Sequence, residues 1–187
     1  MRTDSADAAD APDAAGDDAG AHDAAGDSAD DAGPNLEPNA TFETGADGWI
    51  ALQGTLAVSA TAHGGAKSMR VCTNVAGTTT NFSGDDNLSP GSAIIGASYR
   101  ARAWVRTDPG AIVPGPLQLG LRTVNEDVGS VVKDSTLSTP VALDATWRQL
   151  GVTLDVTERG LLNVTASAMT ALGACFLLDD VALQRIR

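Results

Sequence analysis

Two adjacent aspartates interrupt the last apolar stretch of the sequence, ACFLLDDVALQ (residues 174–184). Asp179 and Asp180 cannot enter the core of a β-sheet alone, because burying an unpaired carboxylate is costly. One partner that fits is a hard cation such as calcium, which takes six to eight oxygen ligands at roughly 2.3–2.6 Å. The alternative is that both side chains accept hydrogen bonds from backbone amides at a strand end. The pattern therefore predicts either half of a metal site or a carboxylate-capped strand.

Catalytic chemistry has little support in the sequence. It contains no Gly-x-Ser-x-Gly elbow, Walker motif, His-Glu-x-x-His motif or Cys–His pairing. A glycosidase needs two carboxylates in one cleft, whereas Glu37, Glu43, Glu126 and Glu158 fall in expected turns or at the start of the domain. We therefore expect a protein that is not an enzyme.

The two cysteines, Cys72 and Cys175, lie far apart in sequence within similar strand-like contexts, MRVCT and GACFLL. They do not make a zinc site, because His22 lies in the tail and His63 in an expected turn. They are either reduced and buried, since free cysteine packs as a small hydrophobe, or joined in a disulfide, which suits an exported domain.

The segment YRARAWVR (residues 99–106) alternates small or apolar residues with large polar ones. Successive side chains of a strand point to opposite faces, so period two assigns one set to the core. The core set is Tyr99, Ala101, Ala103 and Val105, and the outward set is Arg100, Arg102, Trp104 and Arg106. Three guanidinium groups beside an indole form an unusual outer face, which makes it a candidate binding surface.

The elements that must position these groups are short strands. Runs rich in Val, Thr, Leu and Ala alternate with turn signals such as HGGAK, SGDDNLSPGS, TDPGAIVPGP and LDAT, and no segment predicts a long helix. The expected strands are Trp49–Leu52, Thr55–Ala60, Ser68–Thr73, Thr78–Phe82, Tyr99–Thr107, Leu117–Asn125, Val131–Leu137, Thr146–Asp155, Leu161–Ala168 and Cys175–Leu183. So many short strands predict an all-β fold, an antiparallel β-sandwich or jelly roll, over residues 34–187.

The acidity of the chain belongs to its first 33 residues. The net charge is −12, with 24 acids and 12 bases, and residues 1–33 hold ten aspartates and one arginine; the remainder has 14 acids and 11 bases, a net of −3. A segment built from Asp, Ala and Gly cannot bury apolar surface, so residues 1–33 are predicted to be a disordered acidic linker. The rest lacks the basic stripe that nucleic acid binding requires.

The sequence shows neither a signal peptide nor a transmembrane span. The Asp/Ala/Gly segment is similar to the linkers that follow the lipid-anchored cysteine of bacterial surface lipoproteins. This similarity implies an extracellular or bacterial cell-surface location, with lipid anchoring of the natural protein as one form of it.

The order of several motifs is more informative than any one of them. PNATFETGADGW is followed by HGGAKSMRV, then LSPGSAIIGASYRARAWVR, then ATWRQLGVTLDV and finally CFLLDDVAL. This order resembles the carbohydrate-binding modules of families 4, 9 and 22, within the galactose-binding-like β-sandwich superfamily, over about residues 38–184. The resemblance implies a module that binds polysaccharide without catalysis and holds a structural calcium.

The resemblance also assigns the calcium ligands. It implies side chains of Glu43 and Asp179, with Asp180 as a further one, and backbone carbonyls around Asn39, Thr41 and Lys67. If Lys67 and Asp179 reach one ion, their strands are neighbours. Paired positions of an antiparallel pair keep a nearly constant index sum, which would place Cys72 almost opposite Cys175. The implied metal site therefore favours the disulfide.

In this family the sugar lies in a groove on the outer face of one sheet, where rings stack on it and polar groups bond its hydroxyls. The residues that the resemblance and the alternation place there are Gln53, Phe82, Arg100, Arg102, Trp104 and Gln118. Phe82 stands where xylan-binding relatives carry a stacking tryptophan. Arginines in a groove favour an acidic polysaccharide, since guanidinium pairs bidentately with carboxylate.

The alternative function is a surface adhesion or assembly module that binds protein. A hollowed face on which Gln53, Phe82 and Trp104 converge would favour glycan binding. A flat face with Trp104 packed under a loop would favour the alternative.

Overall fold

The computed structural model describes residues 33–74, 81–86, 91–125, 131–169 and 172–187. The described part contains ten strands and no helix, and therefore no helix that could cross a membrane. The predicted all-β class is confirmed. The acidic segment predicted to be disordered lies outside the described residues apart from Gly33.

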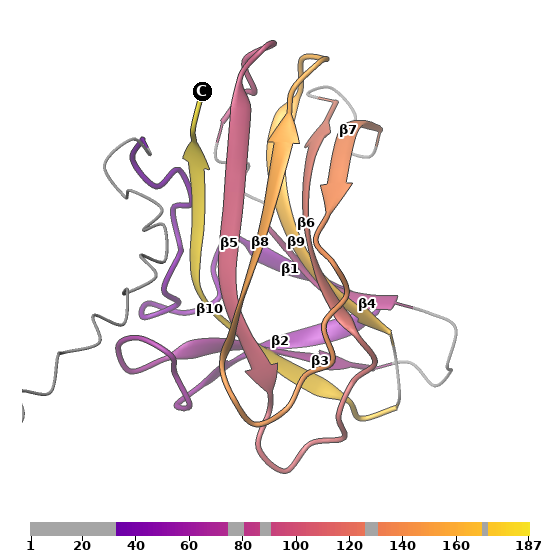
Figure 1. The fold of residues 1–187 in the computed structure, drawn as a ribbon. Coiled ribbons are helices and arrows are strands. Elements are labelled where there is room, and N and C mark those ends of the chain that lie inside the picture. Colours follow the sequence, from indigo (N-terminus) through magenta and orange to yellow (C-terminus); the bar gives the residue numbers. More distant parts are fainter. Residues whose placement is uncertain (1–32, 75–80, 87–90, 126–130, 170–171) are drawn as a thin grey trace, which may run out of the picture. The chain divides into compact units, whose positions relative to one another are not determined.

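The strands form two antiparallel five-stranded sheets (Figure 1). Sheet I has the order β1-β4-β9-β6-β7 and sheet II the order β2-β3-β10-β5-β8. Sheet I consists of β1 (Trp49–Leu52), β4 (Asn81–Asp86), β9 (Leu161–Met169), β6 (Leu117–Val124) and β7 (Val132–Leu137). Sheet II consists of β2 (Gly54–Ser59), β3 (Ser68–Thr73), β10 (Cys175–Arg185), β5 (Ser98–Thr107) and β8 (Arg148–Asp155).

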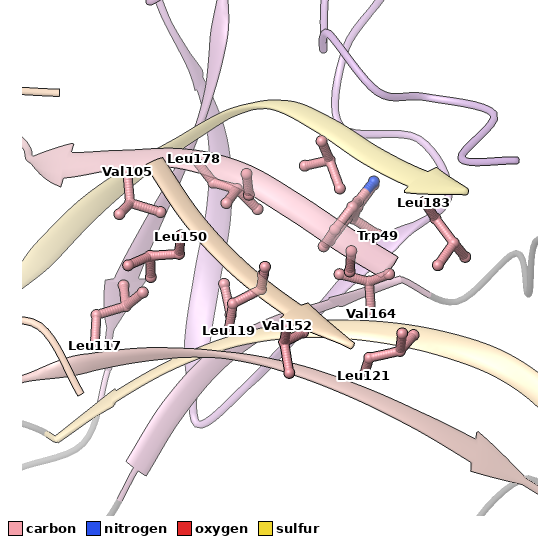
Figure 2. Close-up of a cluster of buried hydrophobic side chains, with 14 of the residues drawn as sticks. Trp49, Val105, Leu117, Leu119, Leu121, Leu150, Val152, Val164, Leu178 and Leu183 are labelled. Carbon is pink, nitrogen blue, oxygen red and sulfur yellow. The ribbon is translucent and has the colours of Figure 1, made fainter. Parts of the chain in front are cut away.

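The core lies between the two sheets, and Figure 2 shows part of it. Alternate residues of β5, β6, β8 and β9 point inward, as period two requires. Members drawn in Figure 2 include Val105, Leu119, Leu150, Val164 and Leu178, each at most 5% exposed. Tyr99, Ala101, Ala103 and Val105 are all in this core, as their alternation predicts.

One strand boundary differs from the sequence prediction in an informative way. Residues 83–86 are predicted to be a turn, but they form most of β4. Gly84 faces the core, where an added Cβ would lie 2.9 Å from the Cε of Met69. Asp85, on the opposite face, accepts hydrogen bonds from other strands of sheet I. Cross-strand partners therefore outweigh the local turn preference of Gly and Asp.

The segment of residues 33–40 pairs with the part of β10 that β3 does not reach. β3 pairs with β10 only as far as Leu178. Beyond it, Leu36 donates its amide to the carbonyl of Leu183, and Val181 donates its amide to the carbonyl of Ala40. The handover from β3 to the N-terminal segment therefore falls at Asp179 and Asp180.

The disulfide of the sequence prediction is confirmed. Cys72 of β3 and Cys175 of β10 are register partners and their sulfurs are bonded, with Cα atoms 4.2 Å apart. This covalent link joins residues separated by 103 positions in the chain.

Candidate functional site

The loop at residues 63–67 receives carboxylates from both ends of the domain. Glu43 Oε1 accepts hydrogen bonds from the amides of Ala66 (2.8 Å) and Lys67 (3.0 Å). These two bonds are the main reason that the pKa of Glu43 is lowered. Lys67 also donates from Nζ to the backbone carbonyl of Glu43 at 2.7 Å.

Asp179 enters the same loop from β10 and is fully buried. Its Oδ2 accepts from the amides of His63 (2.7 Å) and Gly64 (3.2 Å), and its Oδ1 accepts from the amide of Asp180 (2.8 Å). Burial, and to a lesser degree the charge of Asp180, raises the pKa of Asp179 although these bonds oppose the rise. We call Glu43, Asp179 and the loop 63–67 the carboxylate clasp.

The backbone on both sides of the clasp is in the left-handed region. Phe42 has φ 58° and Asp180 has φ 46°. A bulky non-glycine residue in this region is an outlier that its surroundings must hold in place. Asp180 sits at the register shift of β10 and hydrogen-bonds through Oδ2 to His63 Nδ1 at 2.7 Å.

The negative charge of the carboxylate clasp would suit a cation. The contacts that its carboxylates make, however, are hydrogen bonds from backbone amides. In the described part of the chain, Asp179 has no basic side chain as an ion-pair partner, so a cation would relieve its buried charge. The described residues contain no group of three His, Cys, Asp or Glu side chains that could hold a metal. Asn39 uses its side-chain amide to hold the carbonyls of Gly45 and Asp47. Calcium therefore stays a prediction.

The outward set of β5 lies on the outer face of sheet II, as predicted, but the ring of His63 covers part of Trp104. Trp104 pairs with Asp179 and Gln149 in the register. The His63 ring of the clasp loop stacks on it with centroids 3.8 Å apart and an angle of 13°. Trp147 stands edge-on to His63 and carries Arg106 over its ring. Trp104 is therefore packed under a loop.

The six predicted groove residues do not converge on one surface. Arg100, Arg102 and Trp104 lie on β5 in sheet II, whereas Gln118 lies on β6 in sheet I and donates to the carbonyl of Ser138. Gln53 is exposed between β1 and β2 with φ 53°.

The prediction that Phe82 stacks on a ligand is wrong. Phe82 is 0% exposed and packs against Phe176 with ring centroids 5.4 Å apart. It belongs to the core, because β4 begins at Asn81 and alternation turns position 82 inward.

The outer face of sheet I carries a polar surface that the sequence prediction missed. Register partners share a face, so the pairings define a row across all five strands. This transverse row is Ile50 (β1), Asp85 (β4), Thr165 (β9), Gly120 (β6) and Leu137 (β7). It is aliphatic at both ends and polar in the middle.

A hydrogen-bond network fixes the middle of this face. Arg122 donates from Nε to Asn163 Oδ1 (2.7 Å) and from its NH2 nitrogen to Asp85 Oδ2 (3.1 Å). Thr165 donates from Oγ1 to Asp85 Oδ1 at 2.5 Å. Asp85 is only 3% exposed, although it lies on an outer face. Arg122 is thus fixed by two hydrogen bonds, and its side chain is 30% exposed.

A hollow of about 200 Å³ lies beside this network between β6 and β7. Its lining includes Gly120, Arg122, Ser135, Leu137 and Thr165. An added Cβ on Gly120 would lie 2.6 Å from Thr165 Cγ2 and 3.1 Å from Leu137 Cδ2, so a side chain there would displace two of the lining residues. We call it the β6–β7 hollow.

Known proteins match this chain in structure, but neither a family model nor a curated sequence matches it. A family 61 carbohydrate-binding module in complex with β-1,4-galactotriose matches with TM-score 0.53 and 19% identity, covering 82% of this chain and 99% of the module. A family 22 xylan-binding domain of Paenibacillus barcinonensis matches with TM-score 0.57 and 18% identity, over 82% and 92%.

The fold is that of a carbohydrate-binding-module-like β-sandwich. The resemblance seen in the sequence is confirmed at this level. The same fold also occurs inside enzymes: the enzymatically active domain of tailspike protein 4 from bacteriophage CBA120 matches with TM-score 0.62 and 12% identity over 81% of this chain. This chain spans about a fifth (21%) of the length of that tailspike chain.

The carbohydrate-binding-module-like sandwich keeps every aromatic ring off its sheet I face. Five of the rings are core residues: Phe42, Trp49, Phe82, Tyr99 and Phe176. Trp104 and Trp147 lie against His63 on the sheet II side. Any ligand on the sheet I face would therefore meet hydrogen-bonding groups and aliphatic side chains instead of stacking rings.

Glu37 is a further buried carboxylate. It is 5% exposed, and neither carboxylate oxygen has a hydrogen-bond partner of normal geometry in the described part of the chain. Burial, then the charge of Asp86, raises the pKa of Glu37 to about 7. The amide of Asn39 and the indole of Trp49 are near enough to oppose this rise.

Proposed function

We propose that this protein is a non-catalytic polysaccharide-binding module of the extracellular space or bacterial cell surface, and that its ligand lies on the outer face of sheet I. The observation that carries the proposal is the part of the transverse row on β9, β6 and β7, with the Arg122 network beside it. Hydroxyl-rich ligands need fixed donors and acceptors, and a pre-organised arginine supplies donors at little entropic cost.

Two further observations support the proposal. The solved structures that share this fold include a module bound to β-1,4-galactotriose and a xylan-binding domain. The disulfide between Cys72 and Cys175 suits an oxidising, exported setting. In this setting the acidic segment 1–33 would serve as a spacer between a lipid anchor and the module.

The ligand class that we expect differs from the sequence prediction. The preference for an acidic polysaccharide depended on Arg100 and Arg102 lining the groove, and both lie on sheet II. On sheet I, Asp85 balances the charge of Arg122. We therefore expect neutral polysaccharides to bind more tightly than uronate polymers.

A structural calcium at the carboxylate clasp is part of this proposal. Glu43 and Asp179 would supply carboxylate oxygens, with carbonyls around Asn39, Thr41 and Lys67 as further donors. The buried charge of Asp179 supports it. When bound, the ion would add positive charge between the two ends of the domain and has no part in ligand recognition.

Affinity gel electrophoresis and calorimetry against xylan, β-1,4-galactan and polygalacturonate test the function. Arg122→Lys keeps the charge but cannot bond Asp85 and Asn163 as the guanidinium fork does. We expect it to weaken binding to the retained polysaccharide at least tenfold. Trp104→Ala on sheet II is the matched control and should leave affinity unchanged. Loss of binding in Trp104→Ala alone would contradict the proposal.

The second candidate function is protein binding in adhesion or assembly. The observation in its favour is the stacking of His63 on Trp104, which packs the predicted groove tryptophan under a loop. If the folded wild type is retained by none of the three polysaccharides, this candidate replaces the first.

A further inference from the structure

We propose that the β6–β7 hollow holds a single sugar unit, so that the module recognises a chain end or a side branch instead of a long chain laid across the sheet. The inference rests on the proposed function, because it assigns the part of the ligand that the sheet I face grips.

The size of the hollow is the first argument. The hollow has a volume of about 200 Å³, close to that of a single sugar ring. Gly120 lines the hollow, and the side chains of Thr165 and Leu137 already crowd the position that a Cβ would occupy. Any side chain at position 120 would therefore displace two of the walls.

The chemistry of the walls is the second argument. Leu137 is 58% exposed and Val132 is 44% exposed, which gives the β7 side an aliphatic surface. Arg122 stands on the β6 side with its side chain 30% exposed. Within the described part of the chain its guanidinium donates hydrogen bonds from Nε and the NH2 nitrogen, which leaves the NH1 nitrogen for a ligand. A sugar ring offers C–H groups on its faces and hydroxyls on its edge, which match these two walls.

The other residues of the transverse row offer few binding contacts to a second sugar unit. Thr165 and Asp85 bond each other, and Asp85 is nearly inaccessible. The next exposed apolar residue of the row is Ile50 on β1, at the opposite edge of the sheet. Strands lie about 4.8 Å apart, so Ile50 and Leu137 are separated by roughly 19 Å. Binding contacts are therefore concentrated at one edge.

The position of Ile50 makes it a matched control for Leu137. Both are exposed aliphatic residues of edge strands in the same row. We would titrate the wild type, Leu137→Glu and Ile50→Glu with the monosaccharide, trisaccharide and hexasaccharide of whichever neutral polysaccharide is retained. Melting temperatures show whether each variant is folded. Leu137→Trp is a second test variant, because an indole at the rim adds a surface on which a ring can stack.

The inference predicts that the trisaccharide and hexasaccharide bind within threefold of each other. Leu137→Glu should weaken binding at least tenfold, Ile50→Glu less than twofold, and Leu137→Trp should strengthen it. Affinity that rises at least tenfold from trisaccharide to hexasaccharide, with equal losses in both Glu variants, would overturn the inference while leaving the proposed function intact. If no polysaccharide is retained, both are wrong.

Discussion

Arg122 of β6 donates a hydrogen bond to Asp85 of β4 at 3.1 Å, across the intervening strand β9. Asp85 is almost completely buried and Arg122 partly so. The pair therefore ties three strands of sheet I together on the face where we place the ligand.

Removing the arginine leaves the Asp85 charge without its cation. Breaking a buried pair by removing one partner costs about 3–5 kcal/mol, and the partial exposure of Arg122 reduces this. We expect Arg122→Met to lower the free energy of unfolding by about 2–4 kcal/mol in urea titrations. The control is Arg70→Met, whose ion pair with Asp108 is more exposed on the arginine side (39%). It should cost less than about 1 kcal/mol, and equal losses would show that the cross-strand position is unimportant.

Chelation tests the proposed calcium. If the ion neutralises Asp179, then EDTA should lower the melting temperature of the wild type, because a ligand bound only to the folded state stabilises it. Asp179→Asn should lose this sensitivity to EDTA. Asp134→Asn, which removes a carboxylate that caps Thr157 and Glu158 outside the clasp, should keep it. If EDTA does not change the melting temperature of the wild type, the clasp binds no calcium and its carboxylates are held by backbone amides alone.

Gly65 is the residue of the clasp loop least able to accept a side chain. Its φ is +64°, and an added Cβ would lie 2.2 Å from Glu43 Oε1. Gly65→Ala should therefore destabilise the protein by roughly 1–3 kcal/mol through backbone strain and displacement of the carboxylate. Gly151→Ala is the matched control, because the nearest atoms are 3.8 Å away. A comparable loss in both variants, measured by thermal unfolding, would contradict the role assigned to the loop.

Glu37 predicts an unusual pH dependence of stability. Its pKa in the folded state is about 7, against an ordinary value of 4.5. The folded state then binds the proton more tightly than the unfolded state, so this contribution is complete below about pH 4.5 and is lost as pH rises through about 7. The loss is on the order of 2–3 kcal/mol.

Denaturant titrations between pH 4 and 8 measure this effect. Glu37→Gln should flatten the decline and be more stable than the wild type at pH 8, because a neutral amide replaces a buried charge beside Asp86. Glu158→Gln, at an exposed position, should leave the pH profile unchanged. A wild type whose stability increases from pH 5 to 7 would argue against a buried, proton-binding Glu37.

The disulfide should be a major source of stability. It closes a loop of 103 residues, and removing a native disulfide from a small secreted domain typically costs about 2–5 kcal/mol. We expect the Cys72→Ala/Cys175→Ala double variant to unfold at lower denaturant concentration by a corresponding amount. The reduced wild type should unfold at the same denaturant concentration as the double variant. If the oxidised wild type also unfolds at that concentration, the disulfide does not stabilise the protein.

The alternation of residues 99–106 was sufficient to predict which side of β5 enters the core, because a strand's period of two is a local property. The pairing of Cys72 with Cys175 followed from the family resemblance, and the register confirms it. The prediction for Phe82 is based on the family position of a stacking tryptophan, and it is wrong because the register of β4 with β9 turns Phe82 into the core beside Ala168.

Local residue patterns predict the all-β class and the core-facing set of β5, and the family resemblance indicates the segments that meet at the clasp. Which residues of different strands lie together on one face depends on the tertiary structure. Asp85, Gly120, Arg122, Thr165 and Leu137 come from four strands whose order in sheet I, β4-β9-β6-β7, does not follow their order in the chain. No local pattern records that order, because it arises from long-range pairing between strands. The same pairing places Trp104 on sheet II, away from the sheet I face on which we propose that the ligand binds.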